Sequence, residues 1–176
     1  MLSREHILSA AGKLMAAGAS DVSMRAVASA LGVNAMALYH YFSNKQALRQ
    51  ALIEKAFAPL LAVRPRLARL PTPELRLQLL AKTYLLCAAR ALPLTQHLAH
   101  RGGAPLATVF SELFEQALGN PTPAPSHAVL RNVLVDFLHG AALAGPGSAA
   151  KALDAGWPVL MAGFSQHLAQ GLRTPV

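Results

Sequence analysis

Cysteine and acidic residues are scarce in this sequence of 176 residues, and each scarcity excludes a class of site. The single cysteine, Cys87, excludes an intrachain disulfide and a zinc site rich in cysteine. Only eight Asp and Glu residues occur, and their scatter offers no pair for general acid and base catalysis. Glycine-rich phosphate loops, the Gly-x-Ser-x-Gly elbow and the His-Glu-x-x-His zinc motif are also missing. We therefore predict no enzyme activity, no cofactor and no metal.

Long apolar runs are missing as well, although the chain is rich in apolar residues. Hydrophobic residues make up 53% of the chain and charged residues 14%, which is typical of a folded protein. No uninterrupted run of about 18 apolar residues occurs, and the first residues lack the apolar core of a signal peptide. These absences predict a cytoplasmic protein without a membrane partner.

Basic charge is concentrated in the first part of the chain. Residues 1–70 hold nine Lys and Arg against three acidic residues, a formal charge of +6, whereas residues 71–176 hold seven against five, a charge of +2. Such an excess is expected of a domain that binds polyphosphate. Composition alone leaves generic solvated arginines as an equally good explanation.

Residues 23–48 have the pattern of two short helices joined by a turn, behind a first helix over residues 3–17. Apolar and small residues recur there at spacings that bury one side of two crossing helices: Val27, Ala28, Ala30, Leu31 and Leu38. Gly32 stands where the backbone needs a positive φ, and Ser23 and Asn34 are suited to cap the two helices. The pattern predicts a helix-turn-helix.

Several residues carry a more specific resemblance. They are Arg25, Val27-Ala28, Leu31-Gly32-Val33, Leu38-Tyr39, Phe42, Lys45 and Leu48. In order and spacing they resemble the DNA-binding domain of the TetR family of bacterial transcriptional regulators, over roughly the first third of the chain. The resemblance implies a recognition helix that begins near Asn34. It further implies a homodimer, commonly a repressor, that binds double-stranded operator DNA and is released by a small-molecule effector.

The predicted DNA-binding residues come from the two short helices and the start of the next one: Ser23, Arg25, Asn34, Ala35, Met36, Tyr39, His40 and Lys45. The resemblance implies that Tyr39 and Lys45 contact the DNA backbone and that Arg25 reaches a base edge. A lysine at a helix N-terminus is unfavourable by itself, which favours an external anion beside Lys45. For Ser23, capping alone remains open, and for Phe42 packing on the first helix is the favoured interpretation.

The remainder of the chain predicts only helices, so the fold class is all-α. We place a helix-turn-helix domain at residues 1–48 and a ligand-binding and dimerisation domain at 49–176. Pro59 and Pro65 should interrupt regular helix, which makes residues 58–73 a connection. The further helices are expected at residues 44–57, 72–91, 92–101, 105–118, 126–144 and 149–172, with Pro93 among the boundaries.

The C-terminal part offers candidates for an effector pocket and for a dimer interface. The candidate lining residues, which would give an apolar pocket a few polar groups, are Tyr84, Cys87, Gln96, His97, His100 and Phe110. The last two helices are apolar nearly all round, which favours a four-helix dimer over a monomer's own core. The predicted interface residues are Leu130, Leu134, Phe137, Trp157, Leu160, Met161 and Phe164. A DNA-binding dimer without an effector and a helical interaction protein that retains the motif remain as alternatives.

Overall fold

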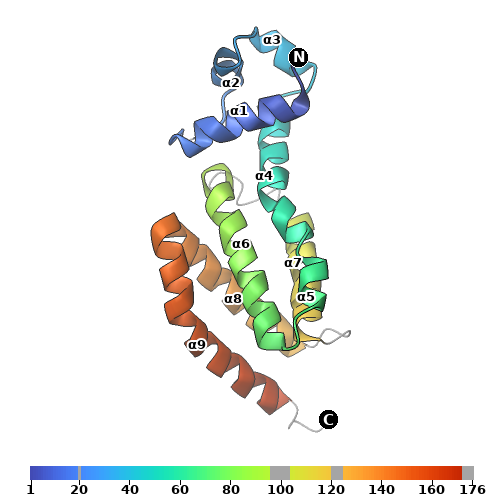
Figure 1. Ribbon diagram of the computed structural model, residues 1–176, viewed down its shortest axis with the longest axis vertical. Helices are drawn as coiled ribbons and strands as arrows, with labels where there is room; N and C mark the ends of the chain where they lie inside the picture. The colour runs from blue at the N-terminus through green and yellow to red at the C-terminus, as the bar shows by residue number, and fades with distance from the viewer. Residues whose placement is uncertain (20, 96–103, 120–124, 172–176) are drawn as a thin grey trace. The chain divides into compact units, whose positions relative to one another are not determined.

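All regular structure in the described residues is helical. The computed structural model describes residues 1–19, 21–95, 104–119 and 125–171, and no strand occurs among them. The helices are α1 Arg4–Ala16, α2 Met24–Ala30, α3 Ala35–Tyr39, α4 Lys45–Leu61, α5 Arg64–Ala68, α6 Pro73–Thr95, α7 Ala104–Leu118, α8 Pro125–Leu143 and α9 Pro146–Gly171 (Figure 1). The all-α prediction is confirmed. Within the same residues, no helix combines the length and the hydropathy needed to cross a bilayer.

The chain divides into two compact units. The first contains Met1–Ala58 and Arg90–Gly103, and the second contains Pro59–Ala89 and Ala104–Val176. Both divisions fall inside long helices, so α4 and α6 each contribute residues to both units. The domain boundary expected after residue 48 lies within α4, in the first unit.

Short-range signals start and stop the helices of the first unit. The Ser23 hydroxyl accepts a hydrogen bond from the backbone N–H of Ala26 at 3.4 Å and caps α2. Gly32, with a φ of 66°, lies in the turn after α2, where a side chain would be strained. Asn34 then caps α3 by accepting from the backbone N–H of Met36 at 2.9 Å. These three assignments, made from residue type alone, are confirmed.

The first unit has a small apolar core. Its most deeply buried large side chains are Ile7, Val27, Leu38, Phe42 and Leu48, each at most 1% exposed. They come from four different helices and from the segment after α3, so α2 and α3 depend on α1 and α4 for burial. Of the two small residues expected between the helices, Ala28 is buried, but Ala30 is exposed at the end of α2, and that part of the prediction was wrong.

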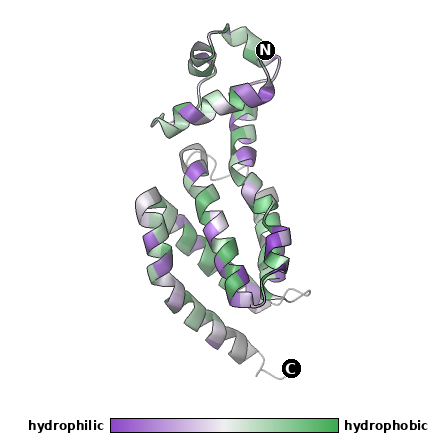
Figure 2. Cartoon of the chain, viewed as in Figure 1, coloured by the Kyte–Doolittle hydropathy of each residue, from purple (hydrophilic) through white to green (hydrophobic). Residues whose placement is uncertain are grey.

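The second unit is a set of packed helices with an aromatic centre. Helix α8 packs along α9, and α5 lies against α7 (Figure 1). Tyr84 of α6 meets Phe110 of α7 edge to face, with 4.8 Å between ring centroids, and Phe114 of α7 meets Phe164 of α9 at 6.4 Å. Figure 2 shows apolar residues along these helices, interrupted by single polar ones.

The prolines interrupt less helix than predicted. Helix α4 continues through Pro59 to Leu61, and α6 continues through Pro93 to Thr95, so neither proline is a boundary. Proline removes one backbone hydrogen bond, and a helix can continue past it where packing holds the neighbouring residues. Near Pro59, Phe57 and Leu60 are both buried. The expected connection over residues 58–73 is therefore largely helical, and Pro65 lies in the first turn of α5.

Candidate nucleic-acid interface

The segment after α3 is anchored on the start of the chain. The Arg4 guanidinium donates from Nη1 to the backbone oxygen of Tyr41 at 3.0 Å, and its Cζ lies 4.3 Å from the ring centroid of Phe42. The Tyr41 hydroxyl donates to the backbone oxygen of Leu2 at 2.8 Å. Phe42 itself is 1% exposed, in agreement with the favoured packing role. Sequence reasoning missed Arg4, because its partners lie 37 and 38 positions away along the chain.

The predicted DNA-binding residues occupy the outside of this scaffold. Ser23, Arg25, Asn34, Met36, Tyr39, His40 and Lys45 are exposed, and Ala35 is half-buried. Met36 is 67% exposed and Tyr39 is 45% exposed, which is unusual for large apolar and aromatic side chains. The side chains of Arg25, Tyr39 and His40 make no hydrogen bond or ion pair within the described residues. A guanidinium, a phenol and an imidazole are thus available to an external partner.

The environment of Lys45 corrects one sequence argument. Its ammonium group forms an ion pair with Asp21, which also pairs with Arg49. The cation at the start of α4 therefore has an anion within the chain and does not by itself require one from outside. The Lys45 side chain is nevertheless 50% exposed, and an ammonium group has three donors, so it can still contact a second anion.

Asp21 organises the loop before α2. Burial raises the pKa of its carboxyl. Hydrogen bonds from Lys45, Arg49 and the backbone N–H of Val22 lower this pKa by a larger amount, so that the net value is about 2. The carboxylate is therefore ionised at any physiological pH. Nothing local in the sequence indicated its partners Lys45 and Arg49, which lie 24 and 28 positions further along the chain.

The predicted effector residues are only partly described. Gln96, His97 and His100 lie outside the described residues. Tyr84, Cys87 and Phe110 are buried in the second unit. The Tyr84 hydroxyl is hydrogen-bonded to Nε2 of His139 on α8 at 2.8 Å, and burial, followed by an electrostatic contribution from the nearby Cys87, raises the pKa of Tyr84 to about 12. Tyr84 is therefore a neutral phenol. Within the described residues, no cluster of three His, Cys, Asp or Glu could hold a metal ion.

The predicted dimer residues are largely inside the second unit. Leu130, Leu134, Trp157 and Phe164 are buried within the single chain, and Phe137, Leu160 and Met161 are half-buried. Helices α8 and α9 approach closely, because a Cβ at Gly156 would lie 2.6 Å from the Phe137 ring. The large apolar side chains that α8 and α9 do expose are Val129, Val133, Leu143 and Val159.

One buried polar pair was not expected from the sequence. Nδ1 of His127 on α8 lies 2.7 Å from a carboxylate oxygen of Glu115 on α7, and both side chains are almost fully buried. The pair links α7 and α8 within the second unit. The two residues lie twelve positions apart on different helices, and no helical periodicity relates them, so this pair could not be predicted from sequence patterning.

Comparison with known proteins agrees with the geometry of the first unit. Residues 7–52 match the family of bacterial regulatory proteins, tetR family, and this match spans α1 to the first half of α4. The match covers about a quarter of the chain, and no curated protein matches the sequence. The two capped helices, the glycine turn and the exposed residues of α2 and α3 all lie inside it. Residues 7–52 are therefore similar to the helix-turn-helix DNA-binding domain of the bacterial regulatory proteins of the tetR family.

Proposed function

We propose that this protein is a repressor that binds a palindromic operator as a homodimer and is released by a small-molecule effector. One observation supports the DNA-binding part of this proposal. The side chains of Arg25, Tyr39 and His40 are exposed and have no partner in the described structure, and the helices that present them are held by buried residues. A rigid surface with free donors is what recognition of a duplex requires.

The proposed contacts divide into those that position the protein and those that specify sequence. Tyr39, His40, Lys45 and the Ser23 hydroxyl donate to phosphates, which fixes the register without reading bases. Arg25 pairs with a base edge, for which guanine O6 and N7 are the best match for a guanidinium.

The start of α3 supplies few hydrogen bonds. Asn34 carries the one polar side chain there, and Ala35 and Met36 offer apolar contacts suited to thymine methyl groups. Specificity in this proposal depends mainly on Arg25 and on DNA shape.

The proposed dimer uses the outer faces of α8 and α9. Val129, Val133, Leu143 and Val159 are each at least 46% exposed there, so these helices retain uncovered apolar surface after the predicted interface residues are counted in the core. A two-fold contact through this surface pairs two helix-turn-helix units. The operator half-sites would then be centred about one DNA turn apart, or a multiple of it.

The effector is proposed to bind near the Tyr84 and His139 pair, where a phenol and an imidazole meet an aromatic core. An effector lowers DNA affinity only if it binds one conformation better than the other. A DNA-binding dimer without an effector is the second candidate. It is favoured by the two hollows found among the described residues of the second unit, because neither is lined by Tyr84, Cys87 or Phe110.

The test is selection of bound duplexes from a random DNA pool by the purified protein at two salt concentrations. A palindromic sequence enriched at both concentrations supports the proposal, and its half-site spacing reports the dimer geometry. Binding that lacks any enriched sequence and disappears at the higher salt concentration would reduce the protein to a non-specific polyanion binder. The enriched duplex then serves as the probe in a screen for molecules that release it.

A further inference from the structure

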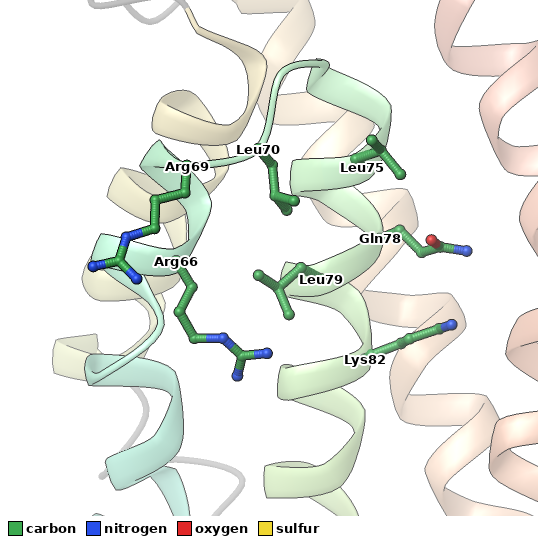
Figure 3. Close-up of a pocket in the computed structure, with 7 residues that line it drawn as sticks. All are labelled: Arg66, Arg69, Leu70, Leu75, Gln78, Leu79 and Lys82. Carbon is green, nitrogen blue, oxygen red and sulfur yellow. The ribbon is translucent and has the colours of Figure 1, made fainter.

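A hollow lies between α5 and the first half of α6, entirely within the second unit. Its volume is about 410 Å³, which lies in the range of about 300–1,000 Å³ typical of small-molecule sites. We call it the α5–α6 hollow, and it is lined by Arg66, Arg69, Leu70, Leu75, Gln78, Leu79 and Lys82 (Figure 3). None of these residues belongs to the predicted effector site or to the DNA-binding surface.

The charge of the hollow is not balanced by its surroundings. Of the three arginines near α5, Arg64 forms an ion pair with Glu112 of α7 at 2.9 Å. The side chains of Arg66 and Arg69 have no hydrogen bond or ion pair within the described part of the chain. Lys82 lies 3.9 Å from Asp154, at the outer limit for an ion pair. No acidic residue lines the hollow, so it carries a surplus of positive charge.

The same hollow has an apolar floor. Leu70 lies between the two helices, Leu79 points from α6 toward α5, and Arg66 extends from α5 toward Leu79 (Figure 3). Leu75 remains 43% exposed, and Leu79 is half-buried. A small molecule that covered these leucines would gain about 25 cal/mol for each square ångström of apolar surface removed from water. The lining thus combines unpaired guanidinium groups with uncovered leucine side chains.

We propose that the α5–α6 hollow binds an amphipathic anion, with its carboxylate or phosphate head group on Arg66 and Arg69 and its hydrocarbon chain on the leucines. Guanidinium groups bind carboxylates and phosphates through paired N–H donors, and Arg is favoured over Lys for this reason. A DNA backbone would use the arginines but leave Leu70, Leu75 and Leu79 exposed, so the apolar floor favours the amphipathic ligand. The binding does not depend on DNA recognition and stands independently of the function proposed above.

The test measures binding by isothermal titration calorimetry of the full chain without DNA. The probes are octanoate and octyl phosphate, with octanol and inorganic phosphate as the two halves of the ligand. We expect saturable binding of both amphipathic anions to one site per chain. Octanol and inorganic phosphate should each bind at least tenfold more weakly, because each engages only one part of the lining.

The double variant Arg66→Gln/Arg69→Gln should weaken octanoate binding at least tenfold, and Leu79→Ser should weaken it as well. The control is Arg64→Gln, which removes one positive charge from α5 at a residue that does not line the hollow. The affinity of Arg64→Gln for octanoate should stay within twofold of that of the parent protein. Both arginines are exposed, so circular dichroism should show the double variant folded.

Four results would overturn the proposal. They are no saturable binding of either anion, equal loss in Arg64→Gln, octanol binding as tightly as octanoate, and inorganic phosphate binding as tightly as octyl phosphate. A double variant that loses duplex affinity and keeps octanoate binding would assign the two arginines to DNA and would also overturn it. Because the calorimetric titrations contain no DNA, failure of the repressor proposal leaves their outcome unaffected.

Discussion

Replacing Asp21 by Asn should lower the stability of the first unit and raise its affinity for DNA. The neutral amide removes the anion that Lys45 and Arg49 share. The pKa of Asp21 is lowered from 3.8 to about 2, and one pKa unit corresponds to about 1.4 kcal/mol. Because 26% of the Asp21 side chain is exposed, solvent screening reduces the expected loss in unfolding free energy to about 1–2 kcal/mol at pH 7.

The loss of unfolding free energy in Asp21→Asn should be largest at neutral pH and should shrink as the pH falls. The folded pKa lies below the unfolded value, so the carboxylate contributes its full stability above about pH 4 and loses it as the pH falls toward 2. Urea unfolding of Asp21→Asn and of the parent protein should therefore differ at pH 7 and converge at pH 2. A constant difference across this range would contradict the assigned ion pair.

The effect on DNA affinity has the opposite direction. Without Asp21, the half-exposed Lys45 carries an uncompensated charge toward the duplex. One added phosphate contact steepens the dependence of log K on log salt concentration by about 0.9. Fluorescence anisotropy over a salt series measures this slope. Glu54→Gln is the matched control, since it removes a carboxylate from the exposed face of α4 that bonds only the Gln50 amide among the described residues. An equal gain in DNA affinity in Glu54→Gln, or no gain in DNA affinity in Asp21→Asn, would refute the reasoning.

Three further substitutions separate base reading from phosphate positioning and from folding. Arg25→Ala should reduce discrimination at one base pair by about 1–3 kcal/mol in competition binding, whereas Tyr39→Phe should weaken binding to all duplexes alike. An unchanged base preference in Arg25→Ala would remove its reading role. Phe42→Ala should cost about 3–5 kcal/mol of unfolding free energy, because the side chain is 1% exposed under the Arg4 guanidinium. A loss below about 1 kcal/mol in urea unfolding would show that the site collapses around the smaller residue.

The parts of the structure that follow from short stretches of sequence were predictable. Ser23, Gly32 and Asn34 each act within three residues of their own position, so residue type and spacing were sufficient to assign them. Such caps and turns depend on local backbone geometry and hardly on the rest of the fold. The helix-turn-helix of the first unit was predictable for the same reason, because its pattern is contained in a short stretch of sequence.

The errors came from interactions between distant residues. Pro59 and Pro93 have the local signature of helix breakers, yet α4 and α6 continue through them. The ion pair of Asp21 with Lys45 joins residues that no helical or strand period relates. The effector and dimer residues stay predictions, since their use depends on which faces remain uncovered once the unit has packed.

The cap of α3 also limits what that helix can recognise. The Asn34 side-chain oxygen already accepts from the backbone N–H of Met36, which occupies one of its two lone pairs, so the NH₂ group is the part of the amide that remains fully free for the proposed contact with DNA. Bidentate pairing with adenine needs both the oxygen and the nitrogen of the amide, and a free NH₂ group is repelled by the amino groups of adenine and cytosine. If Asn34 contacts bases as proposed, the free NH₂ group should favour acceptors such as guanine O6 and N7, adenine N7 or thymine O4. The hydrogen bond that caps α3 thereby reduces the number of hydrogen bonds that its N-cap residue can offer to a partner.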